Sequence, residues 1–458
     1  MKAVVLVLVL CCAVSRAQPP AERARRYLTE LIRIDTANPP GNETRAAEYL
    51  KRIADEEGIP CETLGADAAR LNFLARLSGS GRARPLLLMA HIDVVPAEAA
   101  QWTVPPFSAD LRAGFYWGRG TLDDKSLLAS ELAVLVELKR AGRPLTRDVI
   151  LLAEADEEAR SSGMQWLLRN ARQKLDAEFA VNEGGIAVDM PSGLRLFQIQ
   201  TAEKVPMPVL LRASGTAGHG SLPRPDNALV RVARAAVKLA DADQPVRLNA
   251  TTRRYMSELA RLPEYSWLGP LLGRLERPQT ALSAANEIRS RDPELDAQLR
   301  TTVSPDMMRS GAVVNVIPSV AEAQIDVRRL PSETREEVLA RLRRIVHDSQ
   351  VSVLPLPGHD MPAAEPSSLT TVLYKTMERV FRQAAPKSLV VPYMQTGATD
   401  GSFLREKGMA VYGVPLFLRE DKENRAHSVD ERISPAALES GLELLWQIVS
   451  QVTSSSER

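Results

Sequence analysis

The chain has 458 residues, of which 45% are hydrophobic and 25% are charged. This is the composition of an ordinary globular protein, so it excludes a disordered or fibrous one, and the length is sufficient for two or three domains. The 58 Lys and Arg residues balance the 57 Asp and Glu residues, so no overall charge attracts nucleic acid or an anionic membrane. We therefore expect small molecules or peptides, and no nucleic acid, as partners.

The first 17 residues differ from the rest of the chain. Lys2 precedes an apolar run from Val4 to Val14, and small residues follow at Ser15 and Ala17. This pattern predicts a signal peptide over residues 1–17, and hence an exported protein, periplasmic or secreted, with no membrane attachment after cleavage. The alternative is an uncleaved N-terminal anchor, although the apolar run is much shorter than the roughly 20 residues of a membrane span.

The cysteines restrict the metal chemistry that the chain can support. Cys11 and Cys12 lie in the predicted signal peptide, which leaves Cys61 alone in the mature chain. A single cysteine excludes an intrachain disulfide and a cysteine metal cluster. Any bound metal must therefore use His, Asp and Glu side chains.

Helical and strand patterns alternate after the signal peptide. Two helical stripes come first, at residues 27–32 and 46–53; strands then follow at 85–91, 148–153 and 179–181, with helices at 124–139 and 162–170 between them. The strands are apolar throughout, which is typical of strands buried on both faces. The alternation predicts an α/β class, with helices on both faces of a mostly parallel sheet.

The pattern changes near residue 204. Strands are predicted at 205–213, 321–328 and 351–356, and helices at 227–240 and 333–346. This order predicts an α+β domain over residues 204–357, inserted into a catalytic domain that comprises 18–203 and 358–458. A stretch near 245–305, rich in Arg, Pro and Leu, predicts an extra helical excursion within the insert.

Acidic residues or a histidine occupy four successive strand-end segments, and a further histidine lies far along the chain. The residues are His91 with Asp93, Asp123 with Asp124, the run Asp156-Glu157-Glu158, Glu183, and finally His427. Each segment alone is explained by a strand-end histidine that has ordinary hydrogen-bond partners, or by a solvated acidic loop. The joint pattern is harder to dismiss, because ligands bind at the carboxyl ends of strands in open α/β sheets. Two histidines with three carboxylates suit zinc, cobalt or manganese.

Five motifs carry a resemblance to a known family. They are His-x-Asp, Gly-Arg-Gly-Thr-x-Asp-Asp-Lys, Asp-Glu-Glu, Asn-Glu-Gly-Gly and a late Ala-His, in that order along the chain. With them the sequence, over about residues 21–452, resembles the co-catalytic zinc peptidases that include aminoacylase, carboxypeptidase S, glutamate carboxypeptidase and succinyl-diaminopimelate desuccinylase. Two departures are Ser126, where the family usually has glycine, and the long excursion, which resembles the larger carboxypeptidase S-like members.

The resemblance implies two zinc ions per chain, with cobalt or manganese as substitutes. In the pattern of the family, Asp123 bridges the two ions. His91 and Glu183 complete one ion, and Glu158 and His427 complete the other.

The same resemblance implies roles for residues around the metals. Glu157 is expected to be the general base, and Asp93 is expected to orient His91 and raise its basicity. His219, in the inserted domain, is expected to stabilise the oxyanion in its own site or in that of a neighbouring subunit. A homodimer formed through the inserted lid domain is expected as well.

Four further residues are expected to contact substrate. Asn315 and Arg328 resemble substrate-contacting lid residues, and the Arg328 guanidinium is suited to a carboxylate. Gly397 and Thr399 lie in a loop that resembles the family's carboxylate-receiving loop. The remaining histidines, at positions 347 and 359, match no family motif and are expected at the surface.

These features together predict a metal-dependent hydrolase of an amide bond adjacent to a free carboxylate, either a C-terminal peptide bond or an N-acyl amino acid. Alternatives within the enzyme class are a dipeptidase and a desuccinylase-like deacylase. An exported peptide-binding protein that has lost catalysis is the alternative from another class. Retention of Glu157 beside a full ligand set argues against that alternative, since a binder needs no unligated base there.

Overall fold

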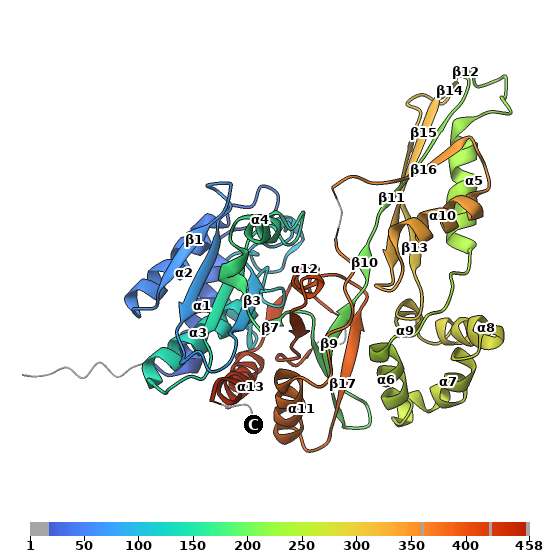
Figure 1. Cartoon of the computed structure of the whole chain (residues 1–458). Coiled ribbons are helices and arrows are strands. Elements are labelled where there is room, and N and C mark those ends of the chain that lie inside the picture. The colour runs from blue at the N-terminus through green and yellow to red at the C-terminus, as the bar shows by residue number, and fades with distance from the viewer. Residues whose placement is uncertain (1–17, 359–360, 421–423, 455–458) are drawn as a thin grey trace, which may run out of the picture.

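The computed structural model describes residues 18–358, 361–420 and 424–454. The predicted signal peptide and His359 lie outside the described residues. The described chain forms a nine-stranded central sheet, a five-stranded second sheet and two smaller sheets (Figure 1). Among its helices, none is both long enough and apolar enough to cross a bilayer.

The central sheet has the strand order β1-β2-β6-β3-β7-β18-β9-β17, and β8 pairs with β9. The strands are β1 (Cys61–Leu64), β2 (Asn72–Leu77), β3 (Leu86–His91), β6 (Val149–Glu154), β7 (Phe179–Asn182), β8 (Ile186–Asp189), β9 (Arg195–Glu203), β17 (Ser388–Gln395) and β18 (Ala410–Gly413). Strands β6, β3, β7 and β18 form a parallel centre, and β1, β2 and β8 add antiparallel neighbours. The predicted α/β class with a largely parallel sheet is confirmed.

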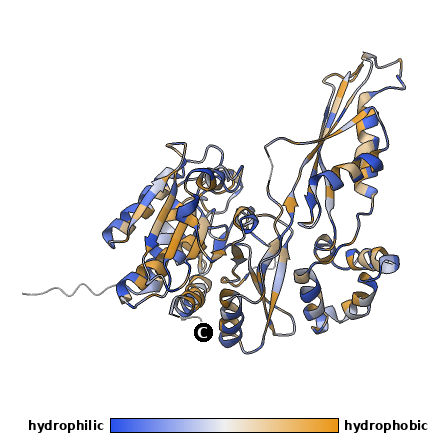
Figure 2. Cartoon of the chain, viewed as in Figure 1, coloured by the Kyte–Doolittle hydropathy of each residue, from blue (hydrophilic) through white to orange (hydrophobic). Residues whose placement is uncertain are grey.

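Helices cover both faces of this sheet. One face carries α1 (Pro20–Arg33), α2 (Thr44–Glu56), α3 (Lys125–Ala141), α11 (Val372–Ala384) and α13 (Pro435–Ser454); the other carries α4 (Ser162–Asn170) and α12 (Gly401–Glu406). Successive residues of β3 alternate between the two cores, with Leu86 and Leu88 on one side and Leu87 and Met89 on the other. Every residue of β3 is therefore buried, which explains its unbroken apolar sequence. Figure 2 shows hydrophobic residues along these central strands.

The second sheet is antiparallel and lies away from the central one (Figure 1). It contains β10 (Val205–Pro206), β11 (Val209–Ser214), β13 (Thr302–Ser310), β15 (Val320–Arg329) and β16 (Val351–Pro355). Residues of β15 alternate between buried and half-exposed, because α5 (Ala228–Asp241) and α10 (Arg335–Val346) cover one face only. A short ribbon, β12 (Gly218–His219) with β14 (Val316–Ile317), forms the far tip.

The segment 245–305 is helical as far as Ala297, and these helices do not join the core of the second sheet. It comprises α6 (Ala250–Leu259), the 3-10 helix η3 (Pro263–Leu268), α7 (Gly269–Leu275), α8 (Pro278–Arg289) and α9 (Pro293–Ala297). Its apolar residues share a core with Leu196 on β9 and with Val391 and Tyr393 on β17. The excursion therefore lies against the edge of the central sheet, which brings α9 to a cavity described below.

Candidate metal centre

His91 ends β3 in the middle of the central sheet, and its side chain is buried. Its Nδ1 lies 2.9 Å from the backbone carbonyl oxygen of Asp93. Donation of the Nδ1 proton to that carbonyl directs Nε2 at Asp123, whose Oδ1 is 2.9 Å away. A backbone acceptor thus fixes the ring and presents Nε2 to a neighbouring carboxylate, as is typical of a metal-binding histidine.

Asp123 lies between two histidines, in the loop that precedes α3. Its Oδ1 faces His91, and its Oδ2 lies 3.1 Å from Nε2 of His427. The same His427 Nε2 lies 3.1 Å from Oε1 of Glu158. One carboxylate therefore offers a different oxygen to each histidine, which is the arrangement of a ligand that bridges two cations.

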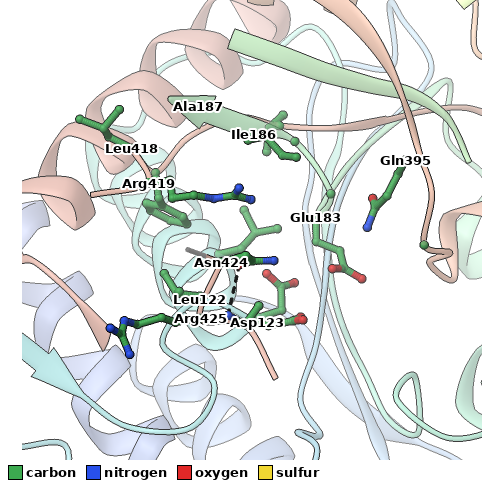
Figure 3. Close-up of a pocket in the computed structure, with 18 of the residues that line it drawn as sticks. Leu122, Asp123, Glu183, Ile186, Ala187, Gln395, Leu418, Arg419, Asn424 and Arg425 are labelled. Atoms are coloured by element: carbon green, nitrogen blue, oxygen red, sulfur yellow. Dashed lines mark hydrogen bonds between the residues drawn. The ribbon is translucent and has the colours of Figure 1, made fainter. Parts of the chain in front are cut away.

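Two donor sets result, and they share Asp123. The first is His91, Asp123 and Glu183, and the second is Asp123, Glu158 and His427; within each set the donor atoms lie within 4.8 Å of one another. The carboxylates of Asp123 and Glu183 face the same space in Figure 3. The structure thus brings together all five residues that the sequence proposed as ligands. Imidazole nitrogens and carboxylate oxygens, without thiolates, fit divalent zinc, cobalt or manganese.

The electrostatics of this cluster favour added positive charge. Burial raises the pKa of Glu183 well above its usual range, and neighbouring carboxylates add to the effect. Burial lowers the pKa of His91, but the carboxylates of Asp123, Glu183 and Glu157 outweigh it, so the net shift is upward. Hydrogen bonds to two carboxylates, that of Asp123 first, raise the pKa of His427 to about 10. Crowded carboxylates are stabilised by protons or by cations that they share.

Asp93 supports the loop that follows β6. Its carboxylate accepts hydrogen bonds from the backbone N–H groups of Glu157, at 3.1 Å, and Glu158, at 3.2 Å, and from the side-chain amide of Asn38, at 2.7 Å. Its contact with His91 is through the backbone carbonyl, and the Asp93 carboxylate lies 3.7 Å from the ring. The side chain of Asp93 therefore holds the Glu157 loop. The expectation from the sequence was instead that it orients His91.

Glu431 is fully buried, and no motif of the sequence gave it a role. Its carboxylate accepts backbone hydrogen bonds from Gly120, Leu122 and Asp123, at 3.0, 2.6 and 3.1 Å, and pairs with Arg119 at 2.6 Å. Glu431 thus binds the loop that carries Asp123. An acidic residue four positions after His427 was the only signal in the sequence, because its partners are mostly backbone amides.

Gly397 and Thr399, the two residues of the loop expected to receive a substrate carboxylate, have different surroundings in the structure. The two donor sets are called the metal groups below. Gly397 lines the cavity beside them. Thr399 is buried, and its N–H and hydroxyl bind Glu203 at 3.1 and 2.9 Å. Glu203 also pairs with the buried Arg405 at 2.8 Å. The prediction for Thr399 is therefore wrong, because a carboxylate of the protein already occupies both of its donors.

The remaining expected residues lie outside the metal groups of their own chain. His219 and Asn315 are exposed and lie at or beside the ribbon of β12 and β14 at the far tip, where Nδ1 of His219 lies 2.7 Å from the Ser221 hydroxyl (Figure 1). Arg328, on β15, donates through Nε to both carboxylate oxygens of Asp326 at 3.0 Å and does not line the cavity. The expectation for Arg328 is a contact with substrate from the lid domain, and it stays a prediction. His347 is exposed at the end of α10, as expected.

A cavity of about 660 Å³ opens beside Asp123 and Glu183. Figure 3 shows side chains from distant segments converging on it. Its apolar wall includes Phe115, Leu122, Leu127, Ile186, Val414, Phe417, Leu418 and Ile433, and its polar residues include Glu294 of α9, Gln395, Arg419, Asn424 and Arg425. The cavity can thus receive a molecule with both apolar and charged parts next to the metal groups.

The model of peptidase family M20/M25/M40 matches residues 87–451. The chain belongs to this family. It is 29% identical over 381 residues to the human N-fatty-acyl-amino acid synthase/hydrolase PM20D1, covering 82% of this chain and 75% of that protein. It is 27% identical over 366 residues to the probable carboxypeptidase S-like 2 of Dictyostelium discoideum, covering 77% of this chain and 68% of that protein.

A solved structure shares the fold. The M20 family metallo-carboxypeptidase Sso-CP2 from Sulfolobus solfataricus superposes with a TM-score of 0.71 at 20% sequence identity, covering 93% of this chain and 98% of that one. Membership of the family makes this member a metal-dependent hydrolase of amide bonds.

Proposed function

We propose that the protein cleaves the amide bond adjacent to a free carboxylate, in N-acyl amino acids or at the C-terminus of peptides, with two zinc ions at the Asp123 cluster. The observation that carries the proposal is the placement of Asp123, which offers one oxygen to His91 and the other to His427, at 2.9 and 3.1 Å. The named activities of the relatives, an N-fatty-acyl-amino acid hydrolase and a carboxypeptidase, support this substrate class.

In this proposal each donor set holds one ion. His91 and Glu183 would hold the first, Glu158 and His427 would hold the second, and Asp123 would serve both. When bound, such a pair of ions lowers the pKa of a water and polarises the scissile carbonyl. Cobalt or manganese would fit the same donors.

Glu157 acts as the general base. It precedes the proposed ligand Glu158 but belongs to neither donor set, and its backbone N–H is held by Asp93. A carboxylate so placed accepts a proton from the attacking water at one oxygen and returns it to the leaving nitrogen. Burial raises the pKa of Glu157 well above its usual range, which makes its carboxylate a stronger proton acceptor than that of an exposed glutamate.

The test is a mass-spectrometric screen of N-acyl amino acids and peptides against zinc-loaded and chelated protein. Each acid is paired with its carboxamide, so that the requirement for a free carboxylate is measured directly. The proposal expects hydrolysis of acids only, abolished by chelation and restored by zinc, with about two metal equivalents per chain. Full metal loading without hydrolysis of any substrate would support the peptide-binding alternative.

The arrangement of the chain supports a proposal about its domains and assembly. Residues 18–203 and 358–458 are proposed as the catalytic domain, and 204–357 as a lid through which two copies dimerise. The position of His219 at the exposed tip, away from the metal groups of its own chain, favours action in the site of a second copy. Light scattering on the eluting protein gives the mass in solution, and a monomer at all concentrations would contradict the proposal.

Export is proposed from residues 1–17, whose pattern is that of a cleaved signal peptide. Mass spectrometry of the intact protein purified from the periplasm or the medium should give a chain that begins at residue 18. Recovery of the full-length chain from membranes would instead indicate the anchor alternative.

A further inference from the structure

Two ion pairs between an arginine and an aspartate lie at opposite ends of β6. Asp148 directly precedes the strand, and its carboxylate accepts a hydrogen bond from Nε of Arg76 at 2.7 Å. Asp156 follows the strand by two residues, and its carboxylate accepts one from Nη2 of Arg70 at 2.8 Å. The proposed base comes directly after Asp156. Only the second pair therefore lies at the end of β6 that leads to the metal groups.

The main chain turns sharply at Asp156. Its φ of 68° lies in the left-handed region, which is unfavourable for residues other than glycine. The turn is closed by three backbone N–H groups: those of Arg160 and Ser161 donate to the Asp156 carbonyl at 3.3 and 2.6 Å, and that of Ser162 donates to its carboxylate at 3.2 Å. Such a conformation persists only where the surroundings hold it. The groups that bind the Asp156 carboxylate thus fix the backbone from which the side chain of Glu157 starts.

Two side chains from distant segments bind that carboxylate. Nη2 of Arg70 and Nδ2 of Asn38 donate to the same oxygen of Asp156, Oδ1, at 2.8 and 2.9 Å. Nδ2 of Asn38 also donates to Asp93 at 2.7 Å, and Asp93 accepts the backbone N–H of Glu157. Asn38 therefore links the two aspartates that hold the Glu157 loop.

Arg70 is itself fixed by a second carboxylate. Its Nη2 donates to Oε1 of Glu43 at 2.6 Å, and its Nε lies 3.1 and 3.2 Å from the two oxygens of Glu43. The Glu43 side chain is fully buried. Gly41, with a φ of 105°, permits this packing, because a Cβ there would lie 2.6 Å from Nε of Arg70. The guanidinium is thus held between Glu43 and Asp156, where it offsets the repulsion between the two carboxylates.

We propose that Arg70 positions the loop that carries the general base, by holding the carboxylate of Asp156. The inference rests on the proposed function of Glu157, and no motif of the sequence pointed to Arg70. Loss of the guanidinium would leave the buried carboxylates of Glu43 and Asp156 without the cation between them. The turn at Asp156 would then shift, and a displacement of the base by about 1 Å costs about 10²-fold in rate.

The experiment compares Arg70→Gln with Arg76→Gln in the zinc-loaded, full-length mature protein. Arg76→Gln is the matched control, because it also removes an arginine that pairs with an aspartate beside β6. At saturating zinc, Arg70→Gln should lower kcat for an N-acyl amino acid by about 10- to 100-fold and change KM by less than about threefold. Arg76→Gln should keep kcat within about twofold of wild type. Arg70→Lys should recover part of the loss, since it restores the charge without the planar fork.

Asp156→Asn tests whether Arg70 acts through Asp156, because the amide keeps the shape of the side chain and removes its charge. If it does, the double variant Arg70→Gln/Asp156→Asn should be no slower than the slower of the two single variants. Losses that multiply in the double variant would mean that the two residues act independently, and would overturn the inference.

Hydrogen exchange of the backbone amides, followed by mass spectrometry, gives a readout that needs no turnover. Peptides that cover residues 155–162 should exchange about tenfold faster in Arg70→Gln than in wild type, and at the wild-type rate in Arg76→Gln. Unchanged exchange in Arg70→Gln, or a normal kcat in that variant, would overturn the inference. If the wild-type protein hydrolyses nothing while exchange rises in Arg70→Gln alone, the proposed function fails and the positioning of the loop by Arg70 stands.

Discussion

The metal groups at the end of the central sheet and the tip of the second sheet carry the two sets of residues expected to do chemistry, and they are built differently. At the metal groups, buried partners hold the functional loops: Asp93 binds the backbone of Glu157 and Glu158, and Glu431 binds that of Asp123. At the tip, the side chain of His219 is exposed and its hydrogen bonds are local, to the residue two positions on.

Exposed apolar residues are a second difference between the two regions. Leu222 is 64% exposed, and Val314 is fully exposed, both near His219 at the tip. The metal groups are organised within one chain, whereas the tip presents apolar surface of the kind that another surface commonly covers. This contrast supports the proposal that His219 functions only after a second copy is added.

The largest expected effect on activity comes from replacing Glu157, the proposed general base at the metal groups. Glu157→Gln should retain metal and lower kcat by about 10²- to 10⁴-fold, because the amide cannot accept the proton from water. Steady-state kinetics and metal analysis of the same sample measure both quantities. A variant with more than about a tenth of the wild-type rate would remove Glu157 from this role. Glu98→Gln, at an exposed site outside both donor sets, controls for a lost surface carboxylate.

The tip is tested next, through His219→Ala. Loss of an oxyanion donor should lower kcat by about 10²- to 10³-fold. Mixing this variant with Glu157→Gln distinguishes the two possible locations of the histidine. If His219 serves the partner's site, the mixed dimer contains one intact site and activity returns to about a quarter of wild type. If it serves its own chain, both sites in the mixed dimer are defective and no activity returns.

Part of the proposed ligand set could be brought together from the sequence because it follows a general rule. In α/β sheets the carboxyl ends of neighbouring parallel strands meet at one edge, so His91 and Glu183, at or just beyond the ends of β3 and β7, had to lie close together. Asp123 and His427 follow no strand of the central sheet, and only the resemblance gave them roles as ligands.

Residues that the sequence misjudged depend on contacts that no local pattern encodes. Thr399 lies in a plausible ligand loop, but Glu203, from a distant strand, binds its donors. The segment 245–305 has amphipathic helices, and their apolar faces do not specify which core they join. Glu431 was overlooked because its partners are mostly backbone amides, which look alike in every sequence.

Replacing Glu431 tests whether its hydrogen bonds to the Asp123 loop support metal binding. Glu431→Gln should weaken metal binding by about 10- to 100-fold, the usual cost of removing a residue that positions a ligand, because the amide cannot accept all the backbone hydrogen bonds at Asp123. Competition with a chromophoric chelator measures the affinity. Asp430→Asn is the matched control, since the adjacent Asp430 binds Thr103 instead. Equal weakening in both variants would contradict the assignment.

The smallest expected effect concerns protons at the metal side. The pKa of His427 is raised to about 10 by its hydrogen bonds to Asp123 and Glu158, so in the metal-free protein this imidazole is protonated at pH 7. A metal ion requires the neutral ring, so binding must release that proton. The affinity for metal should therefore rise with pH, by about tenfold per pH unit for each proton released, until the pH approaches the pKa.

Calorimetry at pH 7 in buffers of different ionisation enthalpy counts these protons; His427→Gln should release about one fewer than wild type. His219→Gln, at the tip, should leave the count unchanged, and an equal count in wild type and His427→Gln would show that His427 does not bind the metal.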